Sequence, residues 1–283
     1  MRPKYITTYL VDGDPTGIKT IELSGRIGKG LIVPRAKLKE SKTREEMKQP
    51  AIYFLFGLDE DGNNLAYIGE AENIFNRLVN HDSNKDFRDI AIIFVSKGND
   101  LAKGDVKFLE SKAIEKAKKI NRYILQNSTE PTQNSLPEYQ ISAMEEFLDN
   151  IDLLISAVGY PILKEFNIKN LNKKQDLYFC KGPEANATGY YSSEGLLVLE
   201  GSKARIELSN TAGSRIQNIQ NKLLTKNIIK KDSEKSFVFI QDYLFNSPSA
   251  AAGLILSRRS NGRKDRKDEK GKTLDENERK SLK

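Results

Sequence analysis

The sequence predicts an α+β protein in which a small domain, built on a short antiparallel sheet with packed helices, is followed by a smaller C-terminal α+β domain. Short runs rich in β-branched and aromatic residues are interspersed with stretches of helical periodicity, without a regular strand–helix alternation. A polar stretch with two prolines, residues 128–137, separates two such series and reads as a linker. The length of 283 residues is enough for two modest domains, each with its own core.

The N-terminal part is expected to contribute strands before the first helix. Their β-branched and aromatic residues predict strands at 4–11, 19–23 and 30–33, the first ended by the Asp12-Gly13-Asp14-Pro15 turn. The charged residues 36–48 are predicted to form a short helix or a loop. We treat residues 1–47 as a β lead segment.

The next segment, residues 48–130, is predicted to fold in the order β-β-α-β-α. Ala51 to Leu58 is a nearly continuous apolar run, too short for a buried helix, and therefore predicts a strand. Turn residues at 59–64 and an apolar stretch at 65–70 complete a β-hairpin. The remaining elements are a helix at 72–82, a strand at 90–95 and a helix at 105–121.

Residues 131–165 are predicted to link two domains, and residues 166–283 to form the second. A strongly amphipathic helix at 141–160 is expected as a connector. Beyond it we expect strands at 177–180, 189–192, 195–200 and 236–241, a helix at 214–225 and a last helix at 248–256.

Composition indicates a soluble protein with a weak preference for polyanions. The net charge is +7 and the pI is near 9.2. No apolar run approaches the roughly 18–20 residues of a membrane helix, and the N-terminal residues lack the apolar core of a secretory signal. A single cysteine, Cys180, excludes an internal disulfide and a multi-cysteine zinc site. We therefore expect a cytoplasmic protein.

Positive charge is concentrated near the C-terminus. Between residues 258 and 272, eight Lys and Arg residues stand against three acids. This stretch is either a solvated terminal loop or a surface that meets phosphates. The candidate DNA-contacting residues are Arg258, Arg259, Lys264 and Lys267.

A set of polar residues within 53–127 could cleave a phosphodiester. Arg77 lies ten residues after Tyr67, and His81, the only histidine, lies four after Arg77 on the same predicted helix. Tyr53 and Tyr67 lie on paired strands, so they can share one surface of the sheet. Hydrolysis of a phosphodiester needs a base, a fixed cation and usually a metal held by a carboxylate, which Glu110 could supply.

These residues resemble the motif series of the GIY-YIG nuclease family. The resemblance covers about residues 49–130 and rests on Ala51-Ile52-Tyr53, Tyr67-Ile68-Gly69, Asn73, Arg77, His81, Glu110 and Asn127. Ala51 stands where the family name has its first glycine. The lone triplet Tyr-Ile-Gly would carry little information, but its spacing to the arginine, the histidine and a helical glutamate is specific.

The resemblance implies a role for each position. Arg77 would stabilise the charge of the transition state, and Glu110 would bind one divalent metal, Mg²⁺ or Mn²⁺. Tyr53 would act as general base or orient the attacking water. Tyr67 and His81 would complete the hydrogen-bond network, and Asn127 would brace the site.

The resemblance also implies an activity, a metal-dependent endonuclease acting on DNA in restriction, defence or repair. A protein that kept the fold but only binds nucleic acid is the alternative, and an enzyme acting on RNA is a third reading. The flanks carry two further resemblances. Residues 10–18 with Pro34-Arg35 resemble the lead of one bacterial subgroup of these proteins. Residues 245–252, 261–262 and 271–274 resemble a small C-terminal domain of unknown function often appended to them, with DNA docking as its expected role.

Three arginines stand where these two flanking resemblances lead us to expect tryptophan, at or near Arg26, Arg263 and Arg266, and the chain contains no tryptophan. Two explanations are open. The positions have diverged, or the gene comes from a lineage that reads an arginine codon as tryptophan.

Overall fold

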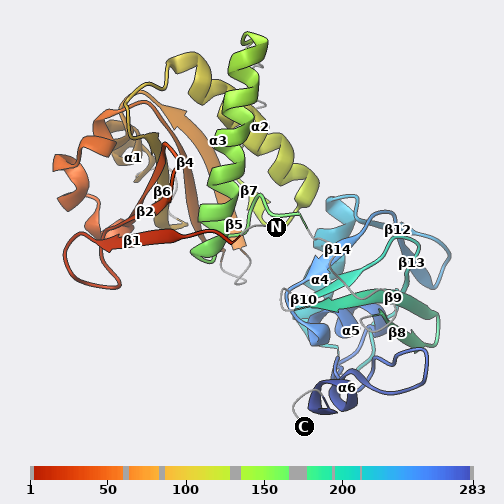
Figure 1. Cartoon of the computed structure of the whole chain (residues 1–283). Coiled ribbons are helices and arrows are strands. Elements are labelled where there is room, and N and C mark those ends of the chain that lie inside the picture. The colour runs from red at the N-terminus through yellow and green to blue at the C-terminus, as the bar shows by residue number, and fades with distance from the viewer. Residues whose placement is uncertain are drawn as a thin grey trace. The chain divides into compact units, whose positions relative to one another are not determined.

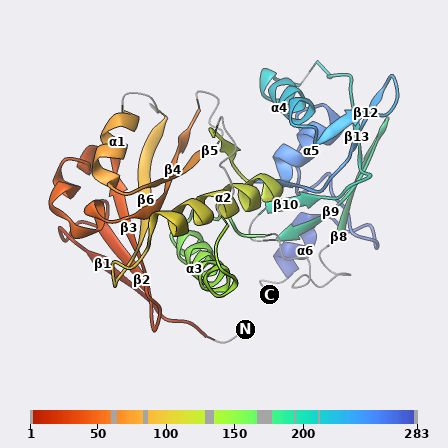
Figure 2. The same cartoon turned by 90° about the horizontal axis from the view of Figure 1, so that it is seen from above.

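The computed structural model describes residues 3–59, 64–82, 87–127, 135–165, 177–192, 195–210 and 212–280. Contacts divide the chain into two compact units, Met1–Phe166 and Asn167–Lys283, each with its own sheet and helices (Figures 1 and 2). The protein is therefore α+β, as the sequence predicts. Within the described ranges, every helix is too short or too polar to cross a membrane.

The first unit is built on one seven-stranded sheet with the order β1-β2-β3-β6-β4-β5-β7. Its strands are β1 (Ile6–Leu10), β2 (Lys19–Leu23), β3 (Gly28–Pro34), β4 (Ala51–Leu58), β5 (Asn64–Ala71), β6 (Arg88–Ser96) and β7 (Ile124–Leu125). Every pair is antiparallel except β5–β7, which is parallel. The N-terminal lead is thus part of this sheet, because β3 pairs with β6 along seven residues.

Helices cover both faces of the sheet. Helix α1 (Ile74–Asp82) lies on one face, while α2 (Lys103–Ile120) and α3 (Glu138–Ala157) lie on the other (Figure 2). We expected the helix now assigned as α3 to connect two domains, but it packs against β2, β3 and α2 inside the first unit. Between β3 and β4 the chain forms three short 3-10 turns, Arg35–Lys37, Glu40–Thr43 and Glu45–Lys48.

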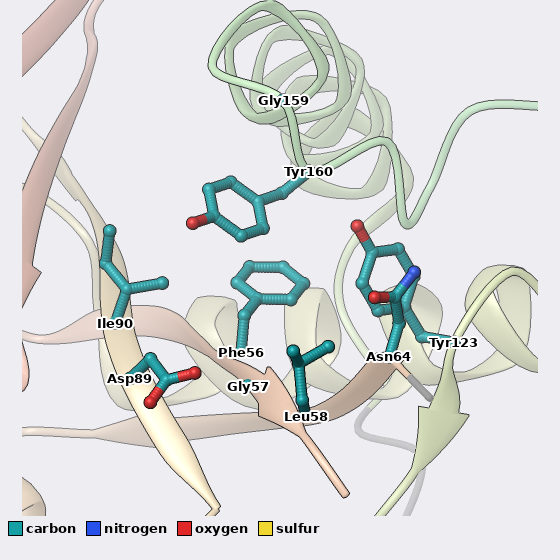
Figure 3. Close-up of a pocket in the computed structure, with 9 residues that line it drawn as sticks. All are labelled: Phe56, Gly57, Leu58, Asn64, Asp89, Ile90, Tyr123, Gly159 and Tyr160. Atoms are coloured by element: carbon teal, nitrogen blue, oxygen red, sulfur yellow. The ribbon is translucent and has the colours of Figure 1, made fainter. Parts of the chain in front are cut away.

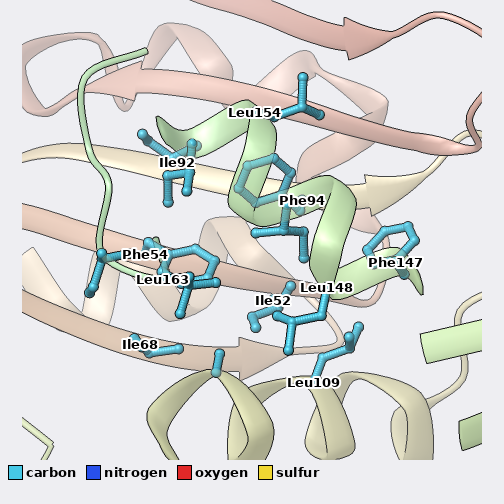
Figure 4. Close-up of a cluster of buried hydrophobic side chains, with 14 of the residues drawn as sticks. Ile52, Phe54, Ile68, Ile92, Phe94, Leu109, Phe147, Leu148, Leu154 and Leu163 are labelled. Atoms are coloured by element: carbon cyan, nitrogen blue, oxygen red, sulfur yellow. The ribbon is translucent and has the colours of Figure 1, made fainter. Parts of the chain in front are cut away.

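Alternation along β4 explains why its sequence is apolar throughout. Ile52 and Phe54 enter the core beneath α2 and α3, together with Phe94, Leu148 and Leu154 (Figure 4). Ala51, Tyr53 and Leu55 point the other way, into the core beneath α1. Because both faces are covered, a strand at this position needs apolar side chains at successive residues.

The second unit holds a second antiparallel sheet, β12-β13-β11-β9-β10-β14, with β8 paired to β9. Its strands are β8 (Leu177–Gly182), β9 (Ala185–Ser192), β10 (Gly195–Val198), β11 (Lys203–Arg205), β12 (Ile229–Lys231), β13 (Ser236–Phe239) and β14 (Tyr243–Phe245). The helices are α4 (Ser214–Thr225), α5 (Pro248–Leu256) and α6 (Leu274–Lys280). The expectation that 248–256 is the last helix is wrong, because α6 follows it.

Helix α5 is the central helix of this unit. The Ser247 side chain accepts a hydrogen bond from the Ala250 amide, and Pro248 occupies the first turn, so the start of the helix is doubly specified. Residues 251–256 are all buried in the second core, which explains why this segment is apolar on every side.

The three arginines that stand at expected tryptophan positions have different environments. Arg266 is 0% exposed, and its Nε, Nη1 and Nη2 atoms have no hydrogen-bond partner among the described residues. Burial lowers its pKa to about 10. Arg26, by contrast, is partly exposed and ion-paired with Glu146, and Arg263 is exposed. Only position 266 is physically unsuited to arginine.

Candidate active site

Gly69, which has no side chain, allows Tyr53 and Tyr67 to come together. The register of β4 and β5 places Tyr53 opposite Gly69, and Tyr67 lies two residues along β5 on the same face. A Cβ atom at position 69 would lie 2.5 Å from the Tyr53 Cζ atom and 2.8 Å from Tyr67 Cε1. Glycine is therefore required at this position for the two rings to approach, with centroids 6.1 Å apart.

Helix α1 directs a cation and an imidazole at the Tyr53 phenol. The helix starts after Asn73, whose Oδ1 accepts a hydrogen bond from the Asn76 amide at 3.1 Å. Its buried residues Ile74 and Leu78 fix which face meets the sheet. Arg77 Nε then donates to the Tyr53 hydroxyl at 3.2 Å, and His81 Nε2 lies 2.8 Å from the same oxygen.

These contacts set the proton positions. Burial, followed by the neighbouring Tyr67, raises the pKa of Tyr53 well above its usual range, so the phenol is protonated at neutral pH. Arg77 can only donate, so the Tyr53 oxygen accepts a hydrogen bond from Arg77. In the His81 tautomer that carries its proton on Nδ1, Nε2 can accept the phenol proton across the 2.8 Å contact.

The four residues form two layers. Tyr53 and His81 are buried, at 0% and 8% exposure, whereas Tyr67 is half-buried and Arg77 is exposed. Side-chain hydrogen bonding to Tyr67 contributes to the pKa of both Tyr53 and Arg77. The phenol that can reach a substrate is thus Tyr67, and Tyr53 lies behind it.

Glu110 lies on α2, which packs on the other face of the sheet from α1. It is half-buried, and burial followed by the charge of Glu70 raises its pKa to about 7. Arg77 and Lys107 lower the same pKa, so Glu110 is within electrostatic reach of Arg77 despite coming from the opposite face. The alternation of β5 places Glu70 on the α2 side, next to Gly69. The sites of Arg77 and Glu110 therefore flank the same end of β5.

Asn127 fixes the edge of β5. Its Nδ2 donates to the Ile68 carbonyl at 2.7 Å, and its Oδ1 accepts from the Ile68 amide at 3.1 Å. These bonds extend the contact with β5 from Ala66, the last paired residue, to Ile68. Beyond this point β5 has no second strand neighbour among the described residues. Asn127 thus binds the backbone of β5, and within the described ranges Gly69 and Glu70 lie on an open edge.

The basic residues expected to contact DNA lie in the second unit, between α5 and α6. Arg259, Lys264 and Lys267 are exposed. Arg258 donates to Asp265 at 3.1 Å and to the Arg259 carbonyl, so part of its charge is compensated. Residues 167–283 carry 23 Lys and Arg against 14 Asp and Glu, whereas residues 1–166 carry 23 against 25. The net positive charge of the chain therefore comes from the second unit.

A cavity of about 250 Å³ lies near the far end of β4 (Figure 3). The Phe56 ring stacks on the Tyr160 ring with centroids 4.5 Å apart, and the Tyr123 ring also packs against Phe56. None of the residues predicted for catalysis lines this cavity. Phe56 points to the opposite face of β4 from Tyr53, so the cavity and the tyrosine pair are separate.

Two residues near the site escaped the sequence reasoning. Glu70 follows the Tyr67-Ile68-Gly69 triplet directly. Because side chains alternate along a strand, Glu70 lies on the opposite face from Gly69, the face that α2 and Glu110 cover. Lys107 lies three residues before Glu110 on α2, a spacing that puts both on one helix face. The strand alternation at Glu70 and the helical spacing of Lys107 were visible in the sequence, but neither residue belongs to a motif.

Comparison with known proteins identifies only the second unit. Residues 178–278 match the model of a family described as a domain of unknown function (DUF4357). The match covers less than half of the chain and spans β8 to α6. Neither the curated proteins nor the solved structures contain a match to this chain.

Proposed function

We propose that the protein is a metal-dependent endonuclease that hydrolyses phosphodiester bonds in DNA, with the cutting site in the first unit. The observation that carries this proposal is the network in which Arg77 and His81 both bind the Tyr53 hydroxyl. Tyr67 joins it at the surface, and Glu110 approaches the same open end of β5. The resemblance of these positions to the GIY-YIG motif series supports the same reading.

Each side chain has a role that follows from its position. Arg77 is exposed and permanently charged, so it can bind a phosphate oxygen and stabilise the charge that develops on it. Tyr67 is placed to contact the attacking water. A proton taken up by the Tyr67–Tyr53 pair can pass along the 2.8 Å contact to His81 Nε2. This arrangement makes Tyr53 a relay between the surface and the imidazole.

The donor set suits a hard divalent cation such as Mg²⁺ or Mn²⁺. No group of three or more His, Cys, Asp and Glu side chains is gathered within the described ranges. Magnesium, however, is often held by one or two carboxylates, with water and substrate phosphate completing its shell. Glu110 would hold the ion, with Glu70 as the nearest further carboxylate. When bound, the ion would supply stabilisation for the leaving oxygen.

The charge distribution supports DNA as the partner and the second unit as the docking module. Contacts with phosphates dominate the affinity of proteins for DNA and make it strongly salt-dependent. The excess of Lys and Arg lies in residues 167–283. Arg258, Arg259, Lys264 and Lys267 are the proposed contacts, and the last three are exposed and form no side-chain ion pair with a described residue.

The test is nicking of supercoiled plasmid by the full chain with Mg²⁺ or Mn²⁺, and with chelator as the blank. We expect Arg77→Ala and Glu110→Gln to abolish nicking. Glu115→Gln, an exposed acid on the same helix, is the matched control and retains it. Cleavage that survives both site substitutions would disprove the assignment. Binding of the plasmid without cleavage would instead identify a nucleic-acid-binding protein. Cleavage of RNA but not of DNA would identify RNA as the substrate.

A further inference from the structure

Strand β1 ends the first sheet and has a free edge. Among the strands that the structure describes, β1 pairs only with β2. The Ser24 amide donates to the Tyr5 carbonyl, and the Val11 amide donates to the Ile18 carbonyl, so the odd-numbered residues direct their backbone groups to β2. The N–H and C=O groups of Ile6 and Thr8 therefore point away from the sheet, and none of them is bonded to a described residue's backbone.

This edge lacks the usual protection against pairing. Natural edge strands carry charges, prolines or bulges that prevent association. The segment Tyr5–Val11 contains none of these residues. It also exposes two large aromatic side chains, Tyr5 at 69% and Tyr9 at 60%. Both lie on the same face as Thr7 because they alternate with residues whose side chains face the first core.

We propose that β1 pairs antiparallel with β1 of a second copy of the chain, about a two-fold axis that passes beside Thr7. In this register Ile6 lies opposite the partner's Thr8, and the two residues exchange both backbone hydrogen bonds. The two-fold axis generates a second, identical Ile6–Thr8 pair. Tyr5 lies opposite the partner's Tyr9 in two symmetry-related pairs, and Thr7 faces its own copy. The segment is self-complementary, as a two-fold interface requires.

The contacts of β1 disfavour two kinds of alternative register. Shifting the strands so that Ile6 faces Leu10 would need the Leu10 carbonyl, which already accepts from the Gly13 amide at 3.3 Å. A shift by one residue would place even-numbered residues of one strand opposite odd-numbered residues of the other. The free N–H and C=O groups of the even-numbered residues would then face backbone groups that already bind β2. The proposed register uses the free groups of Ile6 and Thr8, and it adds two aromatic cross-strand pairs. The proposal does not depend on the proposed function.

Cysteine cross-linking tests both the contact and its register. Facing residues at a non-hydrogen-bonded position have Cα atoms about 4.5 Å apart, within the range that a disulfide bridges. We expect Thr7→Cys to form a covalent dimer of twice the 32.0 kDa chain mass under mild oxidation. Thr8→Cys is the matched control: it is equally exposed, but it would lie beyond the roughly 7 Å limit from its copy and should not bridge.

Solution mass supplies an independent readout. Light scattering on the wild-type chain should show a dimer that dissociates on dilution. Tyr9→Lys should raise the dissociation constant at least tenfold, whereas Tyr139→Lys, at a tyrosine outside β1 that is 77% exposed, should not change it. A wild-type monomer at every concentration would overturn the proposal. So would a Thr8→Cys bridge that forms as readily as the Thr7→Cys bridge, or a dimer that Tyr9→Lys leaves intact.

Discussion

The Tyr53 hydroxyl and His81 Nε2 lie 2.8 Å apart in a layer beneath Tyr67 and Arg77. A buried phenol with a raised pKa cannot hold a negative charge at neutral pH unless its proton has an acceptor. Under the proposed function His81 Nε2 is that acceptor, so we expect the two side chains to act as one unit.

We therefore expect non-additive losses at this pair. Tyr53→Phe should lower the nicking rate about 100-fold or more, which is the usual scale of a lost acid–base group. His81→Ala should cost a similar factor, and the double variant should cost little beyond either single change. Initial rates on supercoiled plasmid measure all three. Losses that multiply in the double variant would show that the two residues act separately.

Gly69 tests the geometry of the tyrosine pair. In Gly69→Ala the new methyl group would collide with Tyr53 and Tyr67, so we expect a loss of about 1–3 kcal/mol in the free energy of unfolding and a strong loss of nicking. Gly213→Ala is the control, because a Cβ there meets no atom within 4 Å and its φ of −76° is ordinary. Denaturant titration measures both variants, and equal stabilities would contradict the clash.

The raised pKa of Glu110, about 7, predicts a pH-dependent metal affinity. Below this pH the carboxyl is mostly protonated and a proton competes with the metal, so Mn²⁺ affinity should rise with pH and level off above 7. Glu70→Gln removes a neighbouring negative charge and should move the midpoint to lower pH. Lys107→Gln removes a positive charge and should move it upward. Calorimetric titration on both sides of pH 7 distinguishes these outcomes, and an unmoved midpoint in both variants would contradict the electrostatic coupling.

The same shift affects folding. The folded-state pKa of Glu110 lies above its ordinary value of 4.5, so the unfolded chain releases its proton first as the pH rises. This group should therefore lower the free energy of unfolding between pH 4.5 and about 7, with no further change above that range. Glu110→Gln should remove this component of the pH dependence, and an unchanged slope in urea titrations would contradict it.

Arg266 is the position where substitution should stabilise the protein. Its guanidinium is fully buried without a hydrogen-bond partner among the described residues, so Arg266→Trp should raise the free energy of unfolding by about 2–4 kcal/mol. Arg263→Trp, at an exposed site, should change it by less than about 0.5 kcal/mol.

Peptide mass spectrometry of protein from its native host would identify the residues at positions 26, 263 and 266. Arginine at all three would exclude codon reassignment.

Most elements could be predicted where a pattern extends over five or more residues. The strand at 51–58 and the helices at 214–225 and 248–256 have the predicted bounds. The strand is marked by its apolar run, and the helix at 248–256 by the Ser247 cap and Pro248. The strands β11, β12 and β14 have three residues each, too few for alternation to show. Helix α6 contains one apolar residue, Leu274, so its sequence lacks helical periodicity.

The site was predictable in membership but not in depth. Strand pairing indicated that Tyr53 and Tyr67 can face each other, and helix periodicity indicated that Arg77 and His81 share one face. That these two pairs form one site was implied by the resemblance to the GIY-YIG family. Which tyrosine reaches solvent depends on how α1 covers β4, a tertiary relationship that no local pattern records. The compensation of Arg258 by Asp265 depends on loop geometry in the same way.

The single thiol of the chain, Cys180, is completely buried in the second core. A cysteine introduced at the surface would therefore be the sole site that reacts quickly with maleimide dyes, with no need to replace the native residue. Fluorescent reporters can thus be attached to either unit of the intact chain. The two steps of the proposed function, DNA capture by one unit and strand scission by the other, could then be followed in real time within a single preparation.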